Sequence, residues 1–178
     1  MKPVLNALGR LGGALATPRR TLIGVLEKGD GSVFEVLLFA LVVGIIVQPT
    51  SAGQAFLLMR VSPLEGLMAL SRVVFGRFGT AFVIVLVGAA IVFVLGRLRV
   101  GFDKILDACA YTLVPHFLLA AVGAALSNLG AELWFLPHRN LKGDGPYFLA
   151  RLAAGYGWSV ALLGLIAIHV LRRPREVE

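Results

Sequence analysis

The chain has 178 residues, 58% of them hydrophobic, a mean hydropathy of +0.86 and a formal net charge of +7. Soluble domains are about 45–50% apolar with glycine counted, and this chain exceeds that value with its 21 glycines left out, which argues against a soluble domain. Its Lys and Arg residues cluster beside apolar runs, a pattern that indicates a membrane surface rather than nucleic acid.

The N-terminal segment, residues 1–31, is predicted to be cytoplasmic and amphipathic. Valine and leucine recur on one helical face of residues 3–15, which fits either a helix on the membrane surface or a partly ordered tail. A second helix should begin with Thr17 as its N-cap and Pro18 in its first turn. The Gly-Asp-Gly sequence at residues 29–31 should end it.

The first long apolar run covers residues 32–48. Its length is at the short end of the range for a membrane-spanning helix, and Pro49 closes it. We expect Glu35, near the start of the run, to extend its carboxylate back towards water.

Residues 54–75 are apolar but contain Arg60, Pro63, Glu65 and Arg72. A charged residue at the centre of a spanning helix costs about 2.5–3.5 kcal/mol, which offsets most of the gain from the apolar side chains here. The segment is therefore expected to lie along the outer interface as an amphipathic or re-entrant element, or to form two helices broken before Pro63. A fifth crossing at this place is the alternative.

Three further apolar runs are predicted to cross the membrane: residues 80–98, 105–128 and 146–171. The expected fold class is therefore an all-α polytopic membrane protein. Its four clear transmembrane helices would form one bundle over residues 32–171, followed by a basic cytoplasmic tail at residues 172–178.

Basic residues predict the orientation of this bundle. Five Lys or Arg precede the first span, three lie between residues 97 and 104, and three lie in the C-terminal tail. Five fall on the opposite side. Because Lys and Arg are retained on the cytoplasmic side, we expect a multi-pass protein of the inner membrane with both termini in the cytoplasm.

Small and polar side chains form stripes on the last two spans. On a helix, one stripe of the third span contains Ala108, Thr112, His116, Ala120, Gly123 and Ser127. The fourth span has a stripe of small residues: Ala153, Gly157, Ala161 and Gly164. Such stripes are typical of helix–helix seams in membranes, so we interpret both as the inner face of the bundle.

Pro115 should kink the third span, because it lacks the N–H that would bond the Tyr111 carbonyl. The freed carbonyl needs a partner in the membrane interior, and Thr112, His116 and a water molecule are candidates. A second interpretation is that the kink and His116 line a small polar cavity. The candidate helix-packing or polar-cavity residues are Asp107, Tyr111, Thr112, Pro115, His116, Gly123, Gly157 and Gly164.

The sequence offers no catalytic, cofactor or metal motif. The three histidines lack ligand spacing, no phosphate-binding loop is present, and no nucleophile–base–acid set is recognisable. Asp103 and Asp107, one helical turn apart, are expected to pair with Arg97 or Arg99 at the membrane surface rather than to form a cation site. We therefore expect a protein that is not an enzyme and that needs no cofactor.

Two stretches, "TPRRTLIGVLEKGDG" before the first span and "GFDKILDACAYTLVPHFLL" in the third, carry a family resemblance. The chain resembles bacterial members of the Yip family, the Ypt-interacting multi-spanning membrane proteins, over roughly residues 15–172. The signature segment of that family, with small residues, an aromatic and a proline inside a span, corresponds here to Asp107, Ala108, Ala110, Tyr111 and Pro115. The family is usually described with five spans, whereas four are clear here.

The resemblance implies an interaction role without catalytic residues. Eukaryotic relatives bind Rab-type GTPases, and some bacterial relatives are similar to accessory subunits of ABC-type exporters. The function expected is a non-enzymatic accessory protein that binds another membrane protein, such as an exporter, through Gly/Ala-rich helix faces; a homo-oligomer also fits. The alternative is a small oligomeric transporter or channel that uses the kinked span around Pro115 and His116.

Overall fold

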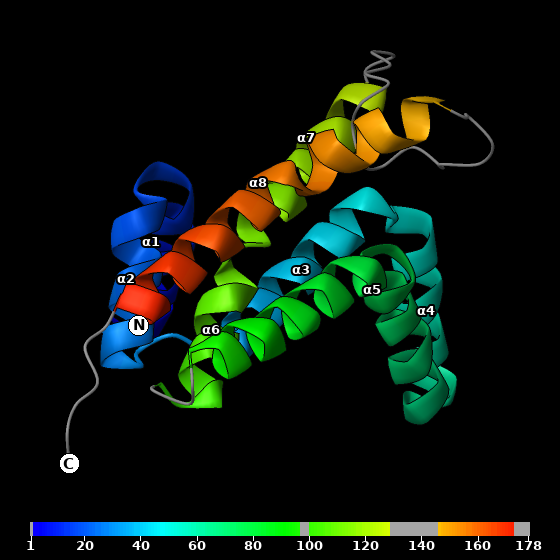
Figure 1. Cartoon of the computed structure of the whole chain (residues 1–178). Coiled ribbons are helices and arrows are strands. Elements are labelled where there is room, and N and C mark those ends of the chain that lie inside the picture. Colours follow the sequence, from blue (N-terminus) through cyan, green and yellow to red (C-terminus); the bar gives the residue numbers. More distant parts are fainter. Residues whose placement is uncertain (1, 97–99, 129–145, 173–178) are drawn as a thin grey trace.

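The computed structural model describes residues 2–96, 100–128 and 146–172, which fold into eight helices (Figure 1). They are α1 (Lys2–Ala16), α2 (Pro18–Lys28), α3 (Val33–Val47), α4 (Pro49–Val61), α5 (Pro63–Leu95), α6 (Phe102–Tyr111), α7 (Val114–Asn128) and α8 (Pro146–Arg172). The N-terminal stretch predicted as a surface helix or a tail is helical, as α1. The tail predicted at residues 172–178 lies outside the described residues, apart from the last residue of α8.

The boundaries of α2 are those that its sequence predicts. Pro18 lies in the first turn and Thr17 occupies the N-cap position, but the Thr17 hydroxyl donates to the Gly13 carbonyl of α1 and does not cap α2. The helix ends at Gly29, whose φ of 66° is left-handed and whose N–H donates to the Val25 carbonyl at 2.9 Å. Glycine adopts this conformation at little cost, so the chain can turn there towards α3.

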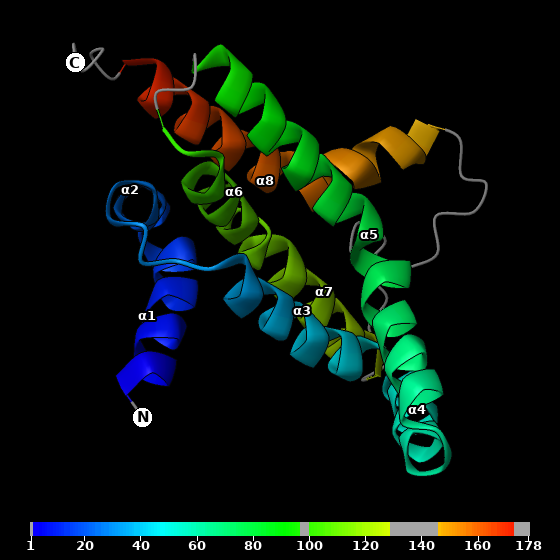
Figure 2. The same cartoon turned by 90° about the horizontal axis from the view of Figure 1, so that it is seen from below.

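Prolines divide the chain between α3 and α5. Helices α3 and α4 meet before Pro49 with a bend of 110°, and α5 begins at Pro63 directly after the end of α4. The expected break before Pro63 is therefore confirmed. The second helix of the pair continues without a break into the run predicted at residues 80–98, so the two form one helix, α5. Helix α4 packs against the first part of α5, and this pair projects from the rest of the molecule (Figures 1 and 2). Gly66 permits the close approach, because a Cβ there would lie 2.5 Å from the Met59 backbone nitrogen.

Helix α3 runs in the same direction as α6 and α7, which follow one another with a short break. The N–H of Val33, at the start of α3, donates to Asp107 in α6. Further along both elements, the ring centroids of Phe39 and Phe117 are 6.3 Å apart. The contacts advance together along the two elements, so they are parallel.

The second part of α5 runs against α6 and α7. Phe93, near its end, contacts Phe102 at the start of α6 with ring centroids 5.4 Å apart. Phe82, earlier in α5, contacts Phe117 in α7 at 5.8 Å. The order of contacts is reversed, so these elements are antiparallel.

Helix α8 runs parallel to the second part of α5. A Cβ at Gly88 would lie 3.1 Å from Leu163, and one at Gly96, after the end of α5, would lie 2.6 Å from Val170. The four elements of the bundle therefore alternate in direction along the chain. The start of the described chain, with α1 and α2, and the end of α8 lie at the same end of the bundle (Figure 1).

Within the described residues, two segments are long and apolar enough to cross a membrane, Phe78–Leu95 and Phe102–Leu126. A third is added if the bent pair Val33–Val47 and Pro49–Val61 forms one span. The segment Tyr156–Arg172 of α8 is apolar but shorter than these segments. The described residues are thus helical, with two or three helices that could span a membrane. The four spans predicted from the sequence are not shown.

Candidate functional site

The start of α3 is enclosed by other elements, and side chains satisfy its first backbone donors. The Ser32 hydroxyl accepts the N–H of Phe34 at 3.1 Å, and Oδ1 of Asp107 accepts the N–H of Val33 at 2.7 Å. The first N–H groups of a helix have no partner within the helix and favour a negative charge nearby. Asp107, a predicted site residue, therefore acts as a cap from a neighbouring helix; the arginines expected to pair with it lie outside the described residues.

Arg10, Glu35 and Tyr111 form a polar cluster where α1, α3 and α6 meet. The Arg10 guanidinium forms an ion pair with the Glu35 carboxylate, with Nε 3.1 Å from Oε2. The Tyr111 hydroxyl donates to the same carboxylate and accepts from Arg10 Nε at 3.3 Å. Glu35 was expected to extend towards water, but it turns to this cluster because a cation and a hydroxyl are available there.

Electrostatics make this cluster a fixed connection between α1 and the bundle. Hydrogen bonding to Glu35 is the main cause that raises the pKa of Arg10 above its ordinary value, so the guanidinium stays charged. A charge-assisted pair with a planar guanidinium is among the stronger hydrogen-bonded contacts in proteins. Neither Arg10 nor the role of Glu35 was predicted; the only sequence signal was a single arginine in the middle of α1, among mainly apolar and small residues.

Pro115 interrupts the third predicted span, as expected. Helix α6 ends at Tyr111 and α7 begins at Val114, and the N–H of Thr112 bonds to the Cys109 carbonyl at 3.1 Å in a tighter turn. The Ser159 hydroxyl of α8 donates to the Thr112 carbonyl at 2.8 Å. The carbonyl that was expected to need a donor is that of Tyr111. The bond from Ser159 of α8 satisfies a different carbonyl of the break, and the Thr112 hydroxyl donates to the Cys109 carbonyl at 2.6 Å.

Ser159 was missed by the sequence interpretation, although the only serine of an apolar span was a signal. Its side chain is fully buried. A hydrogen bond across a helix pair in a membrane stabilises by about 0.6–2 kcal/mol. Ser159 thus joins α8 to the break between α6 and α7.

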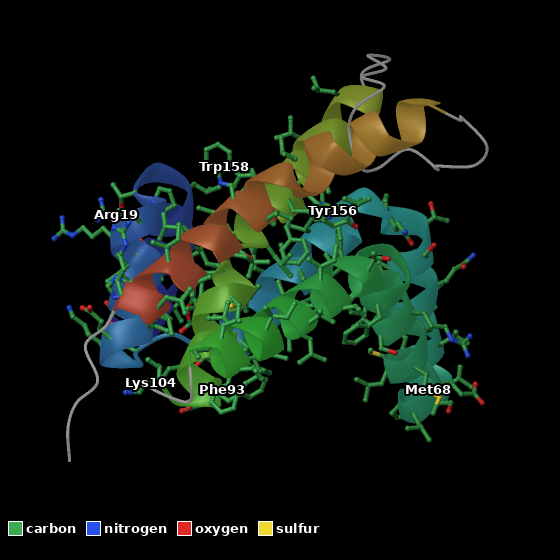
Figure 3. All side chains as sticks on the ribbon, viewed as in Figure 1. Arg19, Met68, Phe93, Lys104, Tyr156 and Trp158 are labelled. Carbon is green, nitrogen blue, oxygen red and sulfur yellow. The ribbon has the colours of Figure 1, made fainter. Side chains whose placement is uncertain are left out.

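His116 packs among rings. It is 2% exposed and stacks on Tyr156 of α8, with centroids 4.6 Å apart and planes at 16°. The rings of Phe78 and Phe117 meet it edge to face at 6.1 and 6.0 Å. Tyr156 is labelled in Figure 3, where it lies between α8 and the bundle beneath it. The geometry is that of a packed seam with one polar ring.

The predicted stripe of the third span does face inward. Ala108, Thr112, His116, Ala120 and Gly123 are all buried. The side chain of Ser127, the last member, lies outside the described residues. This inward stripe agrees with the predicted seam.

The described members of the predicted stripe on the fourth span do not face inward; the side chain of Ala153 lies outside the described residues. Gly157, Ala161 and Gly164 are exposed, and a Cβ at either glycine would meet nothing within 4 Å. Helix α8 buries a different face, which includes Ser159, Leu162 and Ile166. The predicted seam rested on helical spacing alone, whereas larger side chains of another face pack inward. The small residues are left available to another molecule.

Three hollows of the described structure gather around α1, α2 and α8. One lies between α1 and α2, one on α2, and one between α2 and α8. Each is lined by at least two basic residues, whereas Pro115 and His116 line none of the three. Among the described residues, no group of three His, Cys, Asp or Glu side chains could hold a metal ion.

Comparison of the chain with models of protein families, with curated proteins and with solved structures gave no match.

Proposed function

We propose that this chain is a non-enzymatic, Yip-type accessory protein of the inner membrane that binds another membrane protein through the exposed face of α8. The observation that carries the proposal is the outward small-residue face at Gly157, Ala161 and Gly164. Small residues allow the backbone of a second helix to approach closely, and packing of this kind drives helix association in lipid. An ABC-type exporter is the class of partner to test first.

We further propose that the chain crosses the membrane four times with both termini in the cytoplasm. The alternating directions of α3, the second part of α5, α6–α7 and α8 support this topology, because consecutive crossings must alternate. The basic residues of α2 and the end of α8 lie at one end of the bundle, which fits retention of that end on the cytoplasmic side.

A transporter or channel built around His116 receives less support from the same geometry. A conduction path needs a polar, hydrated lining, whereas the His116 ring packs against Tyr156 and two phenylalanines. We therefore keep the interaction role as the proposed function.

A photo-crosslinking amino acid at Ala161 tests the proposal in intact membranes. We expect it to link the chain to one specific membrane protein, and we expect the same probe at Gln54, exposed on α4, not to do so. Gly157→Leu should remove the crosslink without loss of folded protein, because the new side chain meets no neighbour within the fold. Gly53→Leu, at an equally open glycine of α4, is the matched control.

The outcomes separate the alternatives. Crosslinks to an exporter subunit, confirmed by purification of the two proteins together, would support the accessory role. Crosslinks only to a second copy of the chain would favour a homo-oligomer over a separate partner. Crosslinks to lipid alone, with or without Gly157→Leu, would contradict the proposed function.

A further inference from the structure

A groove of about 540 Å³ lies between α2 and the C-terminal part of α8. Arg19 and Ile23 line it from α2. The remaining lining comes from α8: Ala161, Gly164, Leu165, Ile168, His169 and Arg172. These α8 positions extend over about 16 Å along the helix, at 1.5 Å a residue.

The ionisable side chains that line the groove are all basic. Arg19, His169 and Arg172 line it, and no carboxylate does. Within the described residues, neither guanidinium forms an ion pair. Glu27 is the carboxylate that faces this region, and its Oε1 lies 3.3 Å from His169 Nε2, so its charge is directed at the imidazole.

Polarity changes along the groove. Arg172 and His169 lie at the end of α8, whereas Leu165, Gly164 and Ala161 lie deeper along the apolar helix. Figure 3 shows the Arg19 side chain projecting outward at the end of the bundle that α1 and α2 cover. Two further cations of α2, Arg20 and Lys28, line the adjoining hollow that shares Arg19 and Ile23 with the groove.

We propose that this groove binds an anionic phospholipid of the surrounding leaflet. Arg19 and Arg172 bind the phosphate, and one acyl chain lies along Ile23, Gly164 and Ile168. Guanidinium groups bind phosphate oxygens in pairs, and basic pockets beside transmembrane helices on the cytoplasmic side bind anionic headgroups. A charged end joined to an apolar floor about 10 Å long, from Ala161 to Ile168, matches one phospholipid better than a soluble anion, which would leave the floor in water.

Native mass spectrometry of the purified full chain in mild detergent tests the site. We expect one phosphatidylglycerol to be retained and phosphatidylcholine to be released. Arg19→Gln combined with Arg172→Gln should weaken retention by about tenfold or more, since each arginine near a lipid surface contributes to binding an anionic headgroup. Gly164→Leu should do so by filling the floor, because a side chain there meets no neighbour in the fold.

Two variants serve as matched controls. Arg20→Gln removes the adjacent arginine, which does not line this groove, and Gly157→Leu enlarges an open glycine of α8 outside it. Both should keep the lipid, and inorganic phosphate should not displace it. Equal retention of the two lipids, or loss in Arg20→Gln as large as in the double variant, would overturn the proposal. So would unchanged retention in Gly164→Leu. Ala161 and Gly164 belong both to this groove and to the proposed partner-binding face, so Gly164→Leu changes both surfaces. Gly157→Leu, outside the groove, and the double arginine variant, outside the partner-binding face, distinguish failure of one proposal from failure of the other.

Discussion

Arg10 connects α1 to the bundle through side chains alone, because its guanidinium binds Glu35 and Tyr111 from two other helices. A buried or half-buried group that loses its charged partner is left poorly solvated, and such losses usually cost about 1–3 kcal/mol. The position of α1 should therefore depend on this one residue more than on the exposed Val4, Leu5 and Leu8 of the helix.

Arg10→Gln should lower the free energy of unfolding by about 1–3 kcal/mol and loosen α1 first. Hydrogen exchange of the purified protein would show faster exchange of the α1 amides than in the unsubstituted chain. Arg20→Gln is the control, because Arg20 is exposed and contacts neither partner. Equal protection of α1 in both variants would show that the cluster does not fix α1.

Ser159→Ala should destabilise the protein by about 1 kcal/mol, because the Thr112 carbonyl loses its donor from α8. The thermal unfolding midpoint in mild detergent measures this, with Val160→Ala, exposed on the same helix, as the control. No difference between the two variants would mean that the Thr112 carbonyl does not depend on the hydrogen bond from Ser159 of α8.

The elements themselves could largely be predicted from the sequence, because prolines and glycines mark their ends. Pro18, Pro49 and Pro63 each begin a helix, and Gly29 ends one. What could not be predicted is which face of a helix meets a neighbour. The small-residue stripe of α8 has the same helical spacing as a seam, yet larger residues around Ser159 pack inward. Spacing defines a face, whereas contact between distant elements decides which face is buried.

The pairing of α4 with α5 depends on the close approach at Gly66. Gly66→Ala should destabilise this pair by about 1–3 kcal/mol, because the added methyl group meets the Met59 backbone. Gly53→Ala, in the open part of α4, should be neutral or stabilise by up to about 1 kcal/mol through helix propensity. Thermal unfolding and protease resistance of the two variants would test this. Loss of stability in Gly53→Ala but not in Gly66→Ala would contradict the packing.

The molecule as a whole combines a helical bundle with an N-terminal pair of helices at one end and the α4–α5 pair at the other (Figure 2). Its exposed surface includes many large apolar side chains on α3, α5 and α8, as expected where lipid replaces water. The composition alone predicted this class of protein. It could not predict the polar cluster at Arg10, because that cluster joins residues about 100 positions apart.

The most direct test of the proposed topology labels single cysteines with an impermeant thiol reagent in intact spheroplasts. Cysteines replace Asp30, Glu65 and Glu176 one at a time in a Cys109→Ala background, since Cys109 is the sole cysteine and is buried. Four crossings with cytoplasmic termini predict that the cysteine at 65 reacts from outside, while those at 30 and 176 react only after the membrane is opened. Reaction of the cysteine at 176 from outside, with the one at 30 protected, would contradict the four-crossing account and require a fifth crossing.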